Sequence, residues 1–345
     1  MHTDVTPTKS ASPLARRALA FLPIAAAIAY PFVLAAFHAV VSSNWDPSLA
    51  GRSCSVILLL LAFVLPLSGL TVAYRFSQLT PSPATAAAAR LAYASLTAPP
   101  LFVLLGVARS LLKIHVPEVA LWISLWILAG IVVWFAGAAS SIVRTTQISA
   151  NLRVAHGISA ALISCYVLFH LTNHLFGLLG PDTHAAIMKA GRLVYRSRFV
   201  EPVLVILLLF QVASGVRLAW SWSVARSDLY RVFQVGSGAY LAAFILTHLN
   251  SALVSARAVH GIDTDWAWAS GAPVGLIHDA WDIRLLPHYA LGVFFVLGHL
   301  ASGLRVVLLA HGVRPTIANR LWWTGIFLGA TVSATITCAL CGLRI

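Results

Sequence analysis

Two apolar stretches of this chain repeat one spacing of polar residues. The first reads RVAHGISAALISCYVLFH from Arg153 to His170, and the second reads RVFQVGSGAYLAAFILTH from Arg231 to His248. In both, the histidine follows the arginine by 17 residues. A rise of about 1.5 Å per residue places it about 25 Å along an α-helix. If both arginines lie at one face of a membrane, the two histidines lie at equal depth on parallel helices, which is the simplest axial pair for a haem.

The composition of the whole chain places these stretches in a membrane protein. Hydrophobic residues make up 59% and charged residues 10% of the 345 positions, whereas a water-soluble domain has about 25% charged residues. Only helices satisfy all their backbone groups within one segment in lipid, and the apolar runs are long enough to cross as helices. The sequence therefore predicts an all-α, polytopic membrane helix bundle of about nine transmembrane helices. The predicted spans are 18–41, 54–74, 90–112, 117–143, 154–180, 199–221, 231–255, 287–311 and 321–343.

The first span follows Arg16 and Arg17 and resembles the start of a signal peptide. Its apolar run exceeds the roughly 7–15 residues of a signal core, so we interpret it as an uncleaved span. With the N-terminus inside, 13 of the 23 lysines and arginines fall in inner segments, which favours that orientation in the cytoplasmic membrane. The net charge of +13 fits basic loops beside anionic membrane lipid, and no nucleic-acid partner is expected.

The chain divides into four parts. They are a disordered N-terminal tail (1–17), an N-terminal four-helix membrane unit (18–150), a haem-binding-type four-helix bundle (151–312) and a terminal transmembrane helix (313–345). The polar stretch between Arg144 and Arg153 marks the boundary between the two four-helix units. A Ser-Gly pair near the end of spans 2, 6 and 8 indicates a weak internal repeat. Yet Val107, not histidine, stands 17 residues after Arg90, so residues 18–150 are either a ligand-free repeat or an unrelated bundle.

Four of the 13 histidines lie inside apolar runs, where ionisable side chains are rare and usually functional. They are His170, His174, His248 and His299. His170 and His174 share a helix face, but no carboxylate or cysteine accompanies them, so a bare metal ion is weakly supported. His170 and His248, on facing helices, would bind the iron of a low-spin b-type haem. A hydrogen bond between these two histidines without any cofactor is the alternative.

The segment from His299 to Arg305 reads HLASGLR. Together with the two stretches above, it resembles the membrane-anchor cytochrome b subunits of succinate dehydrogenases and fumarate reductases, over spans 5–8. The resemblance implies an outer haem held by His170 and His248, and an inner haem at the positions of Gln211 and His299. An amide is a poor haem ligand, so one haem b is expected and a second lacks a ligand. His299 would then bond Gln211 or ligate a high-spin haem alone. The resemblance also implies a soluble flavoprotein and iron–sulfur partner.

Four further residues are candidates for the outer site. Arg196, Arg198 and Arg284 would bind the haem propionates, or would anchor the chain to lipid headgroups. Glu201 opens span 6 at the same face. It would take protons from a quinol as a catalytic group, or would interact with the positive N-terminal end of its helix. The residues alone leave both alternatives open.

These features predict an integral-membrane b-type cytochrome that passes electrons between a quinone or quinol and a partner redox protein. Such a protein would be an electron-transfer subunit of a quinone oxidoreductase. The alternative is a haem-free structural or lipid-related membrane module that retains the cytochrome b fold. A transporter ranks lower, because helix breaks and charged pairs at mid-membrane are expected there. Pro99-Pro100 in the span 90–112 is the one such break in the sequence, and no mid-membrane carboxylate accompanies it.

Overall fold

The computed structural model describes residues 13–42, 48–136 and 149–345, and every regular element in these ranges is a helix. Eight of them are long and apolar enough to cross a membrane, or nine crossings result if one bent pair counts as a span. The chain is thus a helical, multi-pass membrane protein by the length and composition of its helices. The eight are α1 (Pro13–Ser42), α2 (Leu49–Ser77), α5 (Glu118–Ala136), α6 (Ala150–Leu175), α8 (Val200–Trp222), α9 (Leu229–Leu249), α11 (Leu285–Ala310) and α12 (Pro315–Leu340).

Parts of three predictions fall outside the described residues. Residues 1–12 of the predicted tail (1–17) are outside the described ranges. The remaining five residues of that tail are helical, because α1 begins at Pro13. Residues 137–148 also lie outside the described ranges. They include the end of the predicted span 117–143 and half of the polar boundary before Arg153.

The predicted span 90–112 is not one helix. α3 (Pro83–Leu96) and α4 (Ala98–Leu111) replace it, and the two are bent by 67°. Pro99 and Pro100 directly follow the break. A proline has no N–H to donate and its ring clashes with the carbonyl four residues earlier. The break therefore lies where the sequence placed it, at Pro99-Pro100, and the prolines occupy the first turn of α4, where they are tolerated.

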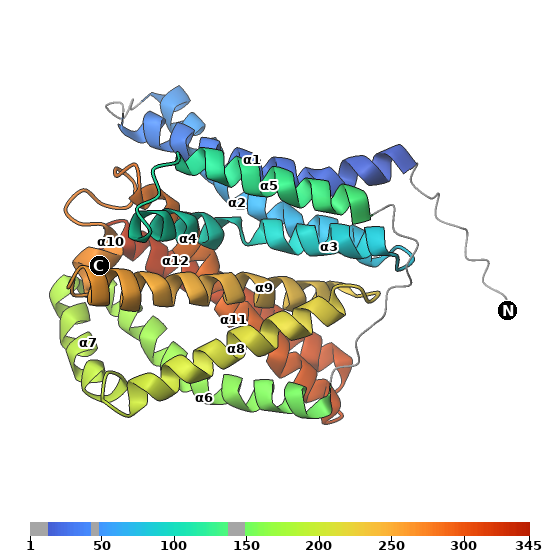
Figure 1. The fold of residues 1–345 in the computed structure, drawn as a ribbon. Helices are drawn as coiled ribbons and strands as arrows, with labels where there is room; N and C mark the ends of the chain where they lie inside the picture. Colours follow the sequence, from blue (N-terminus) through green and yellow to red (C-terminus); the bar gives the residue numbers. More distant parts are fainter. Residues whose placement is uncertain (1–12, 43–47, 137–148) are drawn as a thin grey trace.

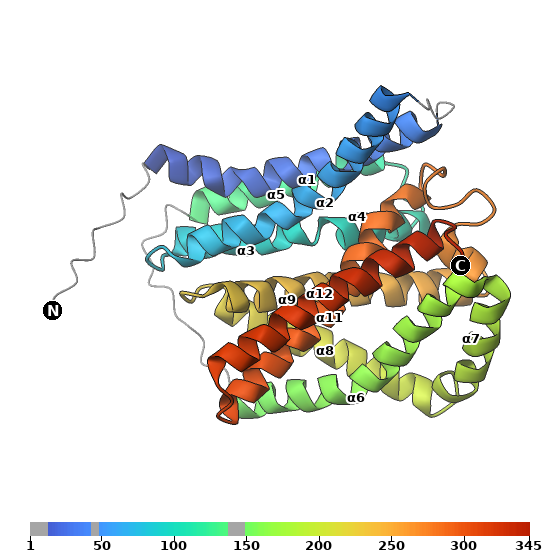
Figure 2. The same cartoon turned by 180° about the vertical axis from the view of Figure 1, so that it is seen from behind.

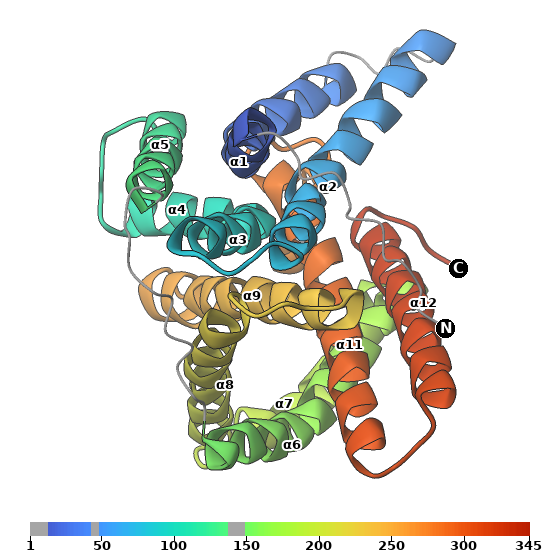
Figure 3. The ribbon, with the colours of Figure 1, turned by 90° about the vertical axis from the view of Figure 1, so that its right-hand side faces the viewer.

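Four helices, α6, α8, α9 and α11, surround a common axis, and we call them the histidine bundle (Figure 3). α12 packs beside α11, and the N-terminal helices α1–α5 lie on the other side of α9 (Figures 1 and 3). Leu96 of α3, Tyr240 of α9 and Phe295 of α11 are buried in one apolar cluster. α9 therefore belongs to both groups of helices and joins them.

One end of the histidine bundle is closed by the segment 256–286. It contains α10 (Trp266–Ser270), and α7 (Pro181–Tyr195) crosses the same end (Figures 1 and 2). The predicted spans 154–180 and 199–221 leave α7 between them, so no helix was predicted here. A proline in its first turn favours a helix start, and His184 and Met188, four residues apart, bury one face of it. We call this end the cap end.

At the opposite end of the bundle, α6 and α9 begin and α11 ends (Figure 1). We call it the arginine end, because Arg153, Arg231 and Arg305 lie there. At the cap end, α9 continues into a π-helix, η2 (Asn250–Val259). π-Helical segments are rare and are frequently found at functional sites.

Candidate functional site

His170 of α6 and His248 of α9 approach each other at the cap end of the bundle. Their ring centroids are 6.1 Å apart and the ring planes cross at 69°. A metal bonded at about 2 Å to one nitrogen of each ring would hold the centroids about 6 Å apart. The equal spacing from Arg153 and Arg231 thus corresponds to a close approach of two histidines on different helices.

An aromatic side chain stacks on each of these rings. Tyr166 lies 5.6 Å from His170 with an interplanar angle of 22°. Phe244 lies 5.7 Å from His248 with an interplanar angle of 10°, and it also contacts His288 at 4.6 Å. Stacked aromatic contacts favour one ring orientation over others. Both candidate ligands are therefore oriented by the protein itself.

Two more histidines extend the cluster towards the cap. Nε2 of His174 lies 3.3 Å from Nε2 of His170, and the His174 ring stacks on His184 of α7 at 5.3 Å. His184 is 1% exposed, lies 3.2 Å from Nδ2 of Asn173, and contacts Trp266 of α10 at 4.7 Å. Sequence reasoning missed His184 because it lies between the predicted spans 154–180 and 199–221. The amphipathic spacing of α7 is the signal that could have found it.

Several buried polar atoms of this cluster have no hydrogen-bond partner among the described residues. They are Nδ1 of His174, Nδ1 of His184, Oδ1 of Asn173 and Nε1 of Trp266. Each such atom costs on the order of 1–3 kcal/mol when it stays unsatisfied, and native proteins satisfy nearly all of them. Within the described ranges, no three His, Cys, Asp or Glu side chains are arranged to hold a bare metal ion. The cluster therefore presents several buried polar atoms that a bound polar group would satisfy.

The fit of a haem depends on Nε2 of His170. A neutral imidazole has one donor and one acceptor nitrogen, and this nitrogen faces His174 at 3.3 Å. It can bond His174 or an iron, but not both. Two neutral imidazoles on facing helices are the donor set of a low-spin b-type haem. His170 and His248 could thus hold a haem iron, and His174 would compete with the iron for Nε2 of His170.

A cavity of about 280 Å³ borders His248 at the cap end. The π-helix η2 contributes Ser251 to its wall, and α11 contributes His288. His288 is 2% exposed, and neither its Nδ1 nor Oγ of Ser251 has a hydrogen-bond partner in the described structure. A partly apolar cavity with a few polar groups is the usual site of a small organic ligand.

Arg196 and Arg198 lie between α7 and α8. Arg196 donates to Oγ1 of Thr264 at 2.7 Å and pairs with Asp263 at 3.6 Å, while Arg192 pairs with Asp263 at 3.0 Å. Burial acts to raise the pKa of Asp263, but the hydrogen bonds and charges of Arg192 and Arg196 hold that pKa below its usual value. Arg198 is exposed. Arg196 therefore connects α7 to the cap, and of the two only Arg198 is open to a propionate or a lipid headgroup.

Arg284 faces the N-terminal helices. Its guanidinium donates to Glu118 of α5 at 2.5 Å and lies over the ring of Phe102 of α4 at 4.4 Å. Arg284 is 8% exposed, so removing either partner would leave an uncompensated buried charge. The structure thus gives Arg284 a carboxylate partner in place of the expected propionate.

Glu201, in the first turn of α8, pairs with Arg257 of η2 through both carboxylate oxygens. No side-chain hydrogen bond caps the N-terminus of α8. Arg257 directly follows Ala256, which lines the cavity beside His248. The ion pair therefore ties α8 to the π-helix near this cavity.

The positions expected for a second haem are arranged differently. Nε2 of Gln211 on α8 donates to the carbonyl of His156 at 2.8 Å and to Oγ of Ser159 at 2.6 Å. His299 of α11 instead bonds Oγ of Ser237 on α9 through Nδ1, at 2.9 Å. The pairing of Gln211 with His299 is therefore absent from the described side chains. The glutamine braces α6 against α8.

No protein-family model, no curated protein and no solved structure matches this chain. A proposal of function therefore rests on the arrangement of the histidines and the cavities beside them.

Proposed function

We propose that this chain is an integral-membrane b-type cytochrome with a haem between His170 and His248. The observation that supports it most is the 6.1 Å separation of the two rings, which matches two imidazoles sharing one iron. Nine spans, in two four-helix units and a terminal helix, would hold this pair within the cytoplasmic membrane. The N-terminus would lie inside, and the cap end would face outward.

A bound haem would supply reversible one-electron chemistry inside the membrane. His170 and His248 would bind its iron as neutral imidazoles, and the stacked Tyr166 and Phe244 would keep both rings oriented. His174 would give up its contact with His170. The apolar side chains around the pair would limit the access of water, which is one of the features by which a protein sets the redox potential of such a centre.

The cavity beside His248 supports the second part of the proposal, a quinone or quinol as the electron carrier in the membrane. Ser251 and His288 would hydrogen-bond the oxygens of the quinone ring, because both have polar atoms without a partner in the described structure. Glu201, held by Arg257, would accept protons released from a quinol. A redox partner protein would complete the electron path.

An absorption spectrum of the purified protein, produced with ample haem, tests this proposal. The wild type should show a Soret band and, on reduction, the sharp bands of a low-spin haem. His170→Ala or His248→Ala should each remove the signal of the cap-end haem. His311→Ala changes an exposed histidine at the end of α11, and this control should keep the wild-type spectrum. A wild type without a Soret band would overturn the proposal.

A haem-free structural or lipid-related membrane module is the second candidate, because one observation favours it. Nε2 of His170 already has a partner, His174, at 3.3 Å. If the histidine cluster serves only packing, added hemin should change neither the spectrum nor the melting temperature of the purified protein. If the cytochrome proposal is right, the same titration should build a Soret band and raise the melting temperature, since a ligand that binds only the folded state stabilises it.

A further inference from the structure

His156 of α6 sits on a Ser-Gly pair of α8, towards the arginine end. Its Nδ1 lies 2.8 Å from Oγ of Ser214, and its Cε1 lies 3.6 Å from where a Cβ on Gly215 would be. The Ser214 hydroxyl donates its only proton to the carbonyl of Phe210 at 2.6 Å. Its oxygen must therefore accept from His156. The proton of the His156 ring is then on Nδ1, and Nε2 is the basic nitrogen.

His299 of α11 sits on a Ser-Gly pair of α9 in the same way. Its Nδ1 lies 2.9 Å from Oγ of Ser237, and its Cε1 lies 3.1 Å from where a Cβ on Gly238 would be. The Ser237 hydroxyl donates to the carbonyl of Gln234 at 3.1 Å, so its oxygen accepts from the histidine. His299 therefore has the same tautomer as His156, and the glycine leaves room for its ring.

Both histidines thus have the arrangement of a metal-binding imidazole. In such a histidine, one ring nitrogen donates to a fixed acceptor and the other is free to ligate. Neither Nε2 has a hydrogen-bond partner in the part of the chain that the structure describes. Their helices, α6 and α11, both border the axis of the histidine bundle (Figure 3).

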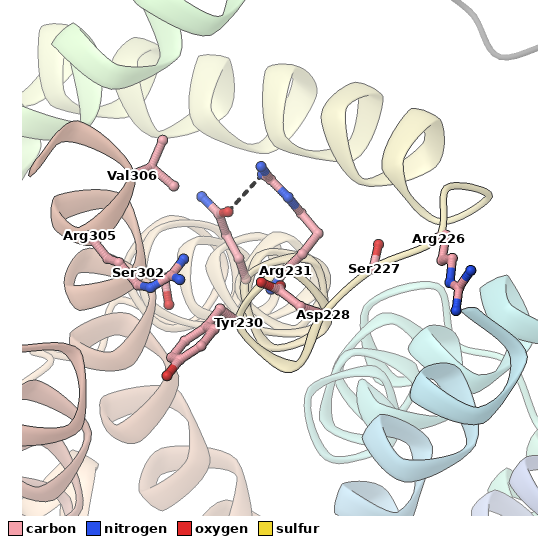
Figure 4. Close-up of a pocket in the computed structure, with 9 residues that line it drawn as sticks. Arg226, Ser227, Asp228, Tyr230, Arg231, Ser302, Arg305 and Val306 are labelled. Atoms are coloured by element: carbon pink, nitrogen blue, oxygen red, sulfur yellow. Dashed lines mark hydrogen bonds between the residues drawn. The ribbon is translucent and has the colours of Figure 1, made fainter. Parts of the chain in front are cut away.

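A basic cavity of about 310 Å³ lies at the arginine end. Arg231 of α9 and Arg305 of α11 line it (Figure 4). Arg305 follows His299 by six residues, which is about 9 Å along the helix. The side-chain partners of both arginines are neutral. Arg231 bonds Oε1 of Gln234 at 2.9 Å, and Arg305 bonds Oδ1 of Asn319 at 2.8 Å.

One carboxylate, that of Asp228, also lines this cavity, but it accepts from the backbone N–H of Arg231 at 2.8 Å. Among the described residues, neither Arg231 nor Arg305 forms an ion pair with a carboxylate. Two guanidinium groups with neutral partners beside one cavity favour an anionic guest, and their planar donors suit carboxylates.

We propose that His156 and His299 are the axial ligands of a second haem b, whose carboxylates lie in the basic cavity with Arg231 and Arg305. This inference rests on the proposed b-type cytochrome function. A haem is the ligand that uses both features, since it brings a metal for two free imidazole nitrogens and two carboxylates for the arginines. The family resemblance placed a ligand at Gln211, on α8. Here the ligand moves to α6, which then carries one ligand of each haem.

The haem content per chain and the low-spin electron paramagnetic resonance spectrum test this inference. The wild type should hold two haems and show two low-spin signals. His156→Ala and His299→Ala should each halve the haem content and remove the same signal. His170→Ala should also halve the content but remove the other signal, and His311→Ala should keep both. If His156→Ala does not fold, Ser214→Ala keeps the ring and should still lower the occupancy of this site.

The outcomes separate the two proposals. A wild type with one haem, lost in His170→Ala and kept in His156→Ala, would refute the second site and leave the cytochrome proposal intact. A wild type without haem would refute both. Arg231→Gln and Arg305→Gln should shift the midpoint potential of the second haem alone. If they leave both potentials unchanged and instead abolish stabilisation by phosphatidylglycerol vesicles relative to phosphatidylcholine vesicles, the cavity binds a lipid headgroup and the carboxylate assignment is wrong.

Discussion

The N-terminal helices and the histidine bundle are packed in different ways. In α1–α5, large aromatic side chains fill the interior, and Tyr30, Phe102 and Trp122 are each 5% exposed or less and meet edge to face. In the bundle, α6 buries four of its 26 residues and α8 buries two of its 23. Half of these six side chains are polar. They are Ser159, Asn173 and Ser214.

This difference separates a scaffold from a site. The aromatic interior of α1–α5 gains its stability from apolar area and close packing, which need no guest. Of the nine buried polar side-chain atoms without a partner in the described structure, two lie in α1–α5 (Oη of Tyr30 and Nε of Arg109) and seven lie in the bundle and its cap, where His170 and His174 also share their ring nitrogens. Such groups are stable only when something satisfies them. Changes in the scaffold should therefore alter stability alone, whereas changes in the bundle should alter ligand binding.

The largest effect is expected when one ligand is removed from each haem. The double variant His248→Ala/His299→Ala leaves a single histidine at either site, so the whole low-spin spectrum should disappear. The matched control from the scaffold is His38→Ala, whose ring bonds the carbonyl of His278 at 2.9 Å, and it should keep the full spectrum. Absorption and electron paramagnetic resonance spectra measure both. A low-spin signal that survives in the double variant would show that other residues bind the iron.

The next largest effect concerns the buried ion pair behind the cap. Arg284→Ala leaves Glu118, whose side chain is 13% exposed, without its partner, which should lower the free energy of unfolding by about 3–5 kcal/mol. Chemical unfolding in detergent measures this loss, and Arg284→Met with Glu118→Leu should recover most of it. The haem content of the folded protein should not change. A variant that keeps its stability but shifts a haem potential would instead support the propionate role that the sequence suggested.

The sequence predicted the helices better than it predicted their contacts. The length of an apolar run was enough to find the membrane class, and the arginine-to-histidine spacing was enough to bring His170 and His248 together, because depth along a helix depends only on residue number. His184 was missed because α7 is short and polar. His156 was not singled out, because the serine that fixes its tautomer, Ser214, lies 58 positions further along the chain. Contacts of that kind depend on how α6 packs on α8, which no local pattern contains.

A smaller effect is expected from pH at the cap end. Burial, and then the charge of Arg192, lower the pKa of His184 to about 4, while Asp265 acts in the opposite direction. An unfolded histidine has a pKa of about 6.5. Between about pH 6.5 and pH 4, His184 binds more protons in the unfolded chain than in the folded one. The contribution of His184 to the free energy of unfolding therefore falls as the pH falls through this window, and it is fully present above about pH 6.5. The total change is on the order of 3 kcal/mol.

Unfolding of the wild type and of His184→Gln across this pH window measures that contribution. The variant should lose most of the slope, because the glutamine side chain does not titrate. Identical slopes in the two proteins would mean that His184 takes up its proton without loss of the fold, and the cap would then be as tolerant of charge as an exposed surface.

The smallest changes in stability come from removing one hydrogen bond in each region, and they sharpen the comparison most. Trp122→Phe removes the bond from Nε1 to the carbonyl of Ala27 at 2.7 Å, and Ser214→Ala removes the hydroxyl that holds His156 at 2.8 Å. Each should lower the free energy of unfolding by about 1 kcal/mol. Ser214→Ala alone should also weaken haem binding at the arginine end by roughly tenfold, since the partner that orients a ligating histidine contributes to affinity. Haem titration measures this difference. Equal affinities in the two variants would make His156 a packing residue, and the two regions would then differ only in how tightly they are filled.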